Sequence, residues 1–170
     1  TAYWERRGWS VRRRPALVYV APSLIVHYIE PHAYQPPAEF IRATVQNAGL
    51  DPFRGLAAGD MVFVDSSHIL MPGTDVDLVL NTVLPGLPAG VLVHFHDIFL
   101  PDGYPEDWGW RGYNEQNAVA ALVASGGWRL RWASRYATSR LARKISDAGL
   151  DRLPLVAGAR ETSLWLAKVR

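Results

Sequence analysis

The chain has 170 residues, of which 49% are hydrophobic and 20% charged, so it has enough apolar content for a folded core and is not a largely disordered chain. A formal charge of +2 is too small to indicate nucleic-acid binding, and nucleic acid is not an expected partner. The absence of cysteine excludes disulfides, a thiolate nucleophile and a cysteine-based zinc site. No apolar run reaches the roughly 20 residues of a membrane span, and Thr1–Pro15 lacks the apolar stretch that is typical of a signal peptide. These features predict a soluble cytoplasmic protein with no membrane contact.

The chain is expected to form one domain over residues 1–170, with residues 1–15 as a basic N-terminal arm. Five arginines lie in this arm, and a solvated arm is favoured over a polyanion-binding patch. Two apolar runs follow, Ala16–Val20 and Leu24–Ile29, separated by a break at Ala21-Pro22-Ser23. The second run ends at Glu30, which the next residue, a proline, keeps extended at a strand terminus.

The next segments predict a βαβ unit. Phe40–Gln46 is interpreted as a short strand and Pro52–Ala57 as a helical turn, and a buried strand follows over Met61–Asp65. Apolar residues at spacings of three and four over Asp75–Leu84 predict an amphipathic helix. Thr74 or Asp75 is the expected N-cap and Pro85-Gly86 the end, before a second strand that runs to Phe95.

The C-terminal part predicts a long loop or lid followed by helices and strands. Residues 98–112 are rich in proline, glycine and tryptophan and show no periodicity. The expected elements after it are a helix over Asn114–Ser125, a half-exposed strand beginning at Trp128, a helix over Thr138–Ala148 and a final strand over Ser163–Val169.

Polar side chains gather at the expected strand ends, where open α/β sheets bind their ligands. The candidates are Glu30, Asp65, His68, His96 and Asp97. Each also has a structural interpretation, since a strand-end carboxylate commonly caps a helix and a lone histidine is commonly structural. His94, one step deeper in its strand, is interpreted as a packed structural imidazole.

Long strings of this sequence resemble the class I S-adenosylmethionine-dependent methyltransferases, and within them methyltransferase domain family 24. The resemblance rests on Gly59-Asp60-Met61-Val62-Phe63-Val64-Asp65-Ser66-Ser67-His68 and on Gly90-Val91-Leu92-Val93-His94-Phe95-His96-Asp97-Ile98-Phe99-Leu100-Pro101, with further matches at Glu30-Pro31, Gly73-Thr74-Asp75-Val76, Leu84-Pro85, Tyr104-Pro105, Asn114-Glu115-Gln116 and Ser163-Leu164-Trp165-Leu166. It implies an α/β fold, a Rossmann-like three-layer sandwich with a mostly parallel sheet and an antiparallel C-terminal strand.

The resemblance also implies a cofactor, S-adenosylmethionine, and O-methylation of a small-molecule acceptor. It places Glu30 at the cofactor's ribose, with Asp65, Ser66 and His68 as further cofactor contacts. His68, His96 and Asp97 are the expected catalytic residues, and either imidazole is a candidate base. Asp65, His96 and Asp97 match the metal-binding positions of metal-dependent relatives, although imidazole is a poor ligand for Mg²⁺. The loop from Tyr104 to Trp110 could close over an apolar acceptor, although packing of its aromatic residues onto the domain is the favoured interpretation.

The chain departs from that family at its N-terminal side. The Gly-rich E-x-G-x-G turn that lets the backbone approach the cofactor has no counterpart upstream of Glu30, where only Ala21-Pro22-Ser23 follows the first run. The first βα unit is therefore expected to be missing or replaced. The alternative function is a truncated or non-catalytic methyltransferase-like binding subunit, with a homo-oligomer as an open alternative. A methyltransferase that acts on RNA would rest only on the N-terminal arginines.

Overall fold

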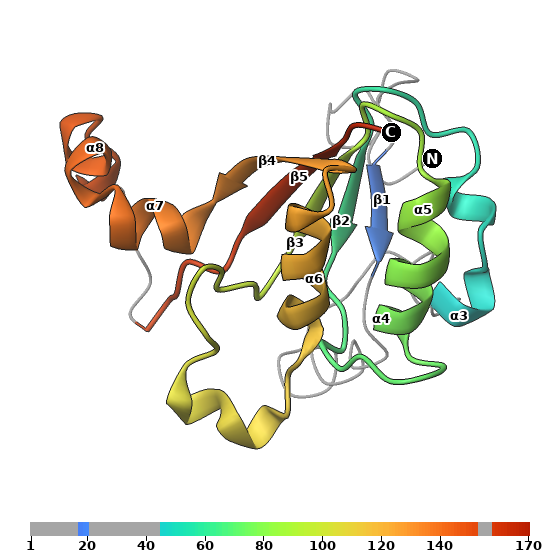
Figure 1. Ribbon diagram of the computed structural model, residues 1–170, viewed down its shortest axis with the longest axis horizontal. Coiled ribbons are helices and arrows are strands. Elements are labelled where there is room, and N and C mark those ends of the chain that lie inside the picture. The colour runs from blue at the N-terminus through green and yellow to red at the C-terminus, as the bar shows by residue number, and fades with distance from the viewer. Residues whose placement is uncertain (1–16, 21–44, 153–157) are drawn as a thin grey trace, which may run out of the picture.

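The computed structural model describes residues 17–20, 45–152 and 158–170 (Figure 1). Five strands form one sheet in the order β1-β2-β3-β5-β4. Their bounds are Leu17–Val20 for β1, Met61–Val64 for β2, Leu92–Phe95 for β3, Trp128–Ala133 for β4 and Leu164–Lys168 for β5. β1, β2 and β3 are parallel, and β5 lies antiparallel between β3 and β4. The expected α/β class with an antiparallel C-terminal strand is confirmed.

The helical segment between β2 and β3 follows its sequence pattern closely. It consists of α4 (Asp75–Leu78), the π-helical turn η3 (Val79–Val83) and α5 (Leu84–Gly86). The N-cap is Thr74, whose Oγ1 accepts a hydrogen bond from the Asp77 backbone N–H at 3.2 Å. The apolar stripe of this segment is buried as predicted, at Val76, Val79, Leu80, Val83 and Leu84.

The end of α5 is held by a lysine from the last strand. Lys168 is buried, and its Nζ donates hydrogen bonds to the carbonyl oxygens of Leu84 at 2.7 Å and Pro85 at 3.1 Å. Burial lowers the pKa of Lys168. Because the last carbonyls of a helix have no partners within it, a cation from β5 satisfies them and ties the helix to the sheet.

The remaining helical segments come before β2 and after β3 in the chain. They are α3 (Val45–Ala48), the 3₁₀ turns η2 (Asp51–Phe53), η4 (Glu106–Arg111) and η5 (Leu150–Arg152), and the helices α6 (Glu115–Ala124), α7 (Ser134–Arg140) and α8 (Ala142–Asp147). Figure 1 shows α7 and α8 extending away from the sheet, beyond the end of β4. The η4 segment lies beyond the sheet on the side of the β1 arrowhead, which marks the carboxyl end of that strand. No helix among the described residues is long and apolar enough to cross a membrane.

Two element predictions are corrected. The strand expected over Phe40–Gln46 is wrong where it can be compared, because Val45–Ala48 forms helix α3; residues 40–44 lie outside the described residues. A short apolar run does not distinguish a buried strand from a buried helical turn, and Val45 reaches the core from a helix. The single helix expected over Thr138–Ala148 is two helices, α7 and α8, which meet at Leu141.

Candidate functional site

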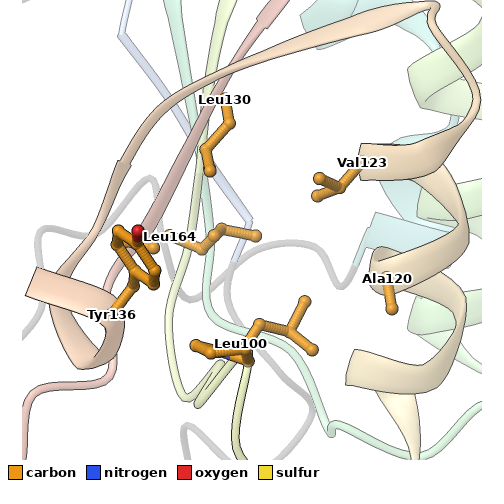
Figure 2. Close-up of a pocket in the computed structure, with 8 residues that line it drawn as sticks. Leu100, Ala120, Val123, Leu130, Tyr136 and Leu164 are labelled. Carbon is orange, nitrogen blue, oxygen red and sulfur yellow. The ribbon is translucent and has the colours of Figure 1, made fainter. Parts of the chain in front are cut away.

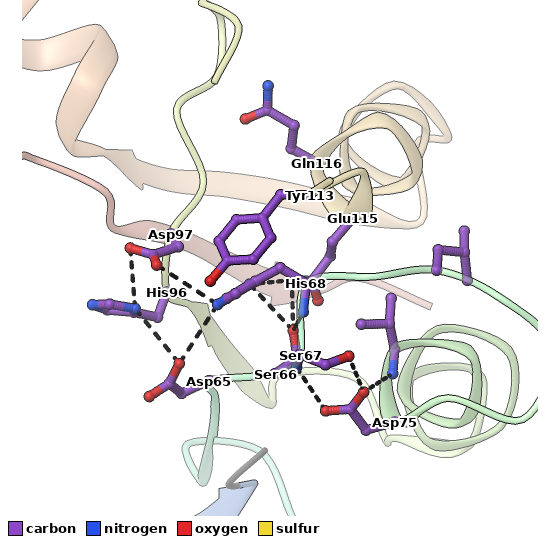
Figure 3. A network of polar contacts seen from close by, with 12 residues as sticks. Asp65, Ser66, Ser67, His68, Asp75, His96, Asp97, Tyr113, Glu115 and Gln116 are labelled. Atoms are coloured by element: carbon purple, nitrogen blue, oxygen red, sulfur yellow. Dashed lines mark hydrogen bonds and ion pairs between the residues drawn. The ribbon is translucent and has the colours of Figure 1, made fainter. Parts of the chain in front are cut away.

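The polar residues predicted at two strand ends meet at one edge of the sheet. β2 and β3 are parallel, Val64 pairs with Phe95, and the His96 backbone N–H donates to the Val64 carbonyl oxygen at 2.9 Å. The residues that leave these strands, Asp65 and His96, therefore lie side by side. The prediction that these strand ends would converge is confirmed for Asp65, His68, His96 and Asp97 (Figure 3).

His68 is fixed through one ring nitrogen and faces two carboxylates with the other. Its Nδ1 lies 2.8 Å from Glu115 Oε2, and its Nε2 lies 3.7 Å from both Asp65 Oδ1 and Asp97 Oδ2. Ser66 Oγ donates to the same Glu115 oxygen at 2.7 Å. Glu115 and His68 are both buried. The imidazole is thereby oriented with Nε2 toward the strand-end carboxylates.

The backbone explains why Glu115 reaches this histidine. The His68 carbonyl oxygen accepts hydrogen bonds from the backbone N–H groups of Asn114 at 3.0 Å and Glu115 at 3.2 Å. These are among the N–H groups that the start of α6 leaves without partners inside the helix. The loop after β2 thus caps α6, and the cap places the first side chain of the helix against the imidazole.

Burial and the surrounding carboxylates act in opposite directions on His68. Burial by itself lowers the pKa of His68, but the hydrogen bonds to Asp65 and Glu115, with the charges of Glu115 and Asp97, outweigh it and raise the pKa to about 9. The imidazole is therefore protonated at neutral pH while the site holds no metal ion.

His96 completes the cluster on its open side. Its Nδ1 lies 3.3 Å from Asp97 Oδ1 and 3.6 Å from Asp65 Oδ1, and its side chain is 42% exposed. His68 and Asp97 both have positive φ angles, 59° and 53°, in the left-handed region that side chains seldom adopt. Strained backbone at two members of one polar cluster is typical of a functional site.

A second carboxylate supports the loop from the other side. Asp75, at the start of α4, accepts hydrogen bonds from the Ser67 backbone N–H at 2.7 Å and from the Ser67 hydroxyl group. This contact ties the loop after β2 to the neighbouring helix. The sequence predicts Asp75 only as a possible N-cap and assigns no role to Glu115. The signals available for both were their place in strings that carry the family resemblance and their position in the first turn of a helix.

His94 is the packed structural imidazole that its depth in the strand suggested. Its ring lies between those of Phe63 and Trp165, with centroids 4.6 Å from each, and its Nε2 is 2.6 Å from Ser163 Oγ. Burial, and then the proximity of His96, lower the pKa of His94 to about 4. The ring is therefore neutral at physiological pH.

The cluster has the donor set of a divalent metal centre. One ligand atom from each of Asp65, His68 and His96 lies within 4.8 Å of the others. For metal–ligand bonds of about 2.0–2.1 Å, neighbouring ligands of a tetrahedral ion are roughly 3.4 Å apart, and within this group Asp65 Oδ1 lies 3.7 Å from His68 Nε2 and 3.6 Å from His96 Nδ1. Glu115 on His68 Nδ1 is the outer carboxylate that metal-bound histidines typically carry. Two imidazoles suit zinc, iron or cobalt better than Mg²⁺.

A cavity of about 480 Å³ opens beside His96 and Asp97. Its other described lining residues are Asp107, Trp108, Arg111, Gly158, Ala159, Arg160 and Thr162. Trp108, from the segment predicted as a lid, forms part of this wall, whereas Trp110 is 82% exposed. Glu30, the predicted ribose ligand, lies outside the described residues.

A second cavity, of about 230 Å³, is apolar and does not contain the cluster (Figure 2). It is lined by Leu100, Pro101, Ala120, Val123, Leu130, Ala133, Tyr136 and Leu164. Apart from the hydroxyl group of Tyr136, its lining offers no side chain for acid–base chemistry. The cavity beside His96 is lined by two members of the cluster, His96 and Asp97, and is therefore the candidate functional site.

Comparison with known proteins adds little to this site. A family model described as a domain of unknown function, DUF7919, matches residues 6–45. The match covers less than a quarter of the chain and includes none of the cluster. No curated protein and no solved structure matches the chain.

Proposed function

We propose that this protein is an S-adenosylmethionine-dependent methyltransferase of the class I, Rossmann-like type that methylates a hydroxyl group of a small molecule. The observation that carries the proposal is the meeting of Asp65, His68, His96 and Asp97 at the carboxyl ends of β2 and β3, beside a cavity. These are the positions to which the resemblance assigns the chemistry. The antiparallel β5 between β3 and β4 supports the same assignment.

The chemistry requires alignment and removal of one proton. S-adenosylmethionine supplies a methyl group on a sulfonium; its C–S bond breaks as the acceptor oxygen forms the new C–O bond. The acceptor's proton must pass to a base. His96 is the better placed imidazole, because its ring lines the cavity and its Nδ1 faces Asp65 and Asp97. His68 is already protonated at neutral pH and instead holds the two carboxylates in position.

A metal ion is compatible with the same residues. Asp65, His68 and His96 would hold it, and its positive charge would lower the pKa of an acceptor hydroxyl group. On the cofactor side, the proposal assigns the ribose hydroxyls to Glu30, because a carboxylate accepts two hydrogen bonds from a vicinal diol.

Calorimetric titration with S-adenosylmethionine tests the proposal. A dissociation constant below about 1 mM is expected, and Glu30→Gln should weaken binding, whereas Arg131→Gln, on the exposed part of β4, should not. His96→Gln should slow methyl transfer by roughly 10²–10⁴-fold with unchanged cofactor affinity, since it removes the proposed base and none of the proposed cofactor contacts. No heat at millimolar cofactor sinks the proposal.

A non-catalytic binding subunit is the second candidate. It is favoured by the residues that follow β1, Ala21-Pro22-Ser23, which contain none of the glycines of a cofactor-binding turn. A stable dimer or hetero-complex without cofactor affinity, measured by mass in solution, would support this candidate. A cofactor-binding monomer excludes it.

A further inference from the structure

Arg111, the last residue of η4, presents a held guanidinium to the cavity that His96 and Asp97 also line. Its central carbon lies 4.1 Å from the ring centroid of Trp108, 5.3 Å from that of Trp110 and 5.4 Å from that of Tyr113. Its Nη1 donates to the Tyr113 hydroxyl oxygen at 3.1 Å. The cation is thus held by aromatic rings rather than by a carboxylate.

The guanidinium still has hydrogen-bonding capacity. Its Nε is buried and has no acceptor among the described residues, and no described carboxylate forms an ion pair with it. The other arginine of the cavity differs, because Arg160 makes two hydrogen bonds to Asp107, at 3.0 and 2.8 Å, which neutralise its charge. A buried donor without an acceptor is costly unless a ligand supplies the acceptor.

Tyr113 connects this cation to the polar cluster. Its hydroxyl group contacts Arg111, and its ring lies 4.5 Å from the ring of His68 (Figure 3). The lining of the cavity therefore combines the guanidinium of Arg111 with the imidazole of His96 and the carboxylate of Asp97. An anionic group on a ligand would be repelled by the carboxylates of Asp65 and Asp97 and attracted by the guanidinium of Arg111.

We propose that the acceptor is a small hydroxyl compound that carries an anionic group, either a carboxylate or a phosphate, and that Arg111 binds this group while the hydroxyl reaches His96 and Asp97. The planar fork of arginine matches both anions with two parallel hydrogen bonds. The proposal rests on the proposed function for the fate of the hydroxyl group, whereas anion binding at Arg111 is measurable without the cofactor.

Paired probes test the anion and its source by calorimetry without S-adenosylmethionine. The pairs are 4-hydroxybenzoate with 4-hydroxybenzamide, and glucose 6-phosphate with glucose. In at least one pair the anion should bind about tenfold to hundredfold more tightly than the neutral partner, as expected for charge-assisted hydrogen bonds. The pair that shows the preference identifies a carboxylate or a phosphate. Equal affinities in both pairs, or no binding at 10 mM of any probe, overturn the proposal.

Three variants locate the preference. Arg111→Gln should abolish the preference for the anion, Arg111→Lys should retain part of it, and the control Arg131→Gln should behave as wild type. An undiminished preference in folded Arg111→Gln overturns the proposal; if that variant does not fold, an undiminished preference in Arg111→Lys does so. The two proposals can fail separately. If Arg111→Gln loses the preference for the anion but the wild-type protein does not bind S-adenosylmethionine, the anion site is supported and the methyltransferase function is refuted.

Discussion

The Glu115→Gln substitution tests the electrostatics on which the polar cluster depends. Glu115 is fully buried, and one of its oxygens accepts hydrogen bonds from both Ser66 and His68. Glutamine has the same shape but no charge, so the substitution preserves packing and removes the anion that helps to keep a proton on His68. We expect the variant to be less stable than wild type at pH 6 and to approach wild type as the pH rises.

The magnitude follows from the pKa of His68. A folded pKa of about 9, against the ordinary 6.5, corresponds to at most about 3 kcal/mol of unfolding free energy, since each pH unit is worth about 1.4 kcal/mol. Because the folded pKa is raised, this contribution is fully present below pH 6.5 and is lost as the pH rises through 9. Glu115→Gln should therefore cost about 2–3 kcal/mol at pH 6 and much less at pH 9 or above.

Urea unfolding followed by tryptophan fluorescence measures this at pH 6, 7, 8 and 9, with EDTA to exclude metal ions. The exposed Glu106→Gln in η4 is the matched control and should follow wild type at every pH. Nuclear magnetic resonance titration of His68 gives the pKa directly. A difference between wild type and Glu115→Gln that stays constant from pH 6 to 9, or a His68 pKa below 6.5, would refute the reasoning.

Four further outcomes are expected. Gly90→Ala should destabilise by about 2 kcal/mol or more in thermal unfolding, because φ is +87° and the new Cβ would lie 2.6 Å from Ala58 Cβ; a neutral effect would contradict the close approach. Thr74→Ala should cost about 1 kcal/mol in the same assay through loss of the N-cap of α4, and wild-type stability would exclude that role. Cobalt(II) should bind with new visible absorbance, and Asp65→Asn should weaken binding about tenfold or more, whereas an unchanged wild-type spectrum would reject the metal centre. Because the pKa of His94 is lowered to about 4, the unfolded chain binds a proton below pH 6.5 that the folded chain excludes; stability should fall from pH 6.5 to 4, less steeply in His94→Gln.

The elements that could be predicted are those whose signal is local. The β-branched run of β2 and the buried stripe from Val76 to Leu84 each repeat with the period of their own secondary structure. The segments predicted less well lack that signal. Residues 45–48 are too short to show a period, and the break at Leu141 between α7 and α8 has no proline or glycine to mark it.

Some residues of the candidate site could likewise be predicted from the sequence, and others could not. Asp65 and His96 could be placed together from sequence because parallel neighbours end at the same edge of a sheet. Glu115 could not, because its role depends on how the loop after β2 caps a helix that begins 47 residues after His68. Arg111 lies in a loop without periodicity, and only the rings around it show that its charge is held at the cavity.

The sequence by itself determined the class of fold, the strands β2 and β3, and the polar residues that follow them. Tertiary structure alone decided that β5 lies between β3 and β4, that Glu115 orients His68, and that Arg111 lines the same cavity as His96 and Asp97. The physical reason is the distance along the chain over which the deciding interactions act. Strand and helix patterns arise from neighbours a few residues apart, whereas the protonation of an imidazole and the partner of a guanidinium depend on charges that packing brings from distant segments.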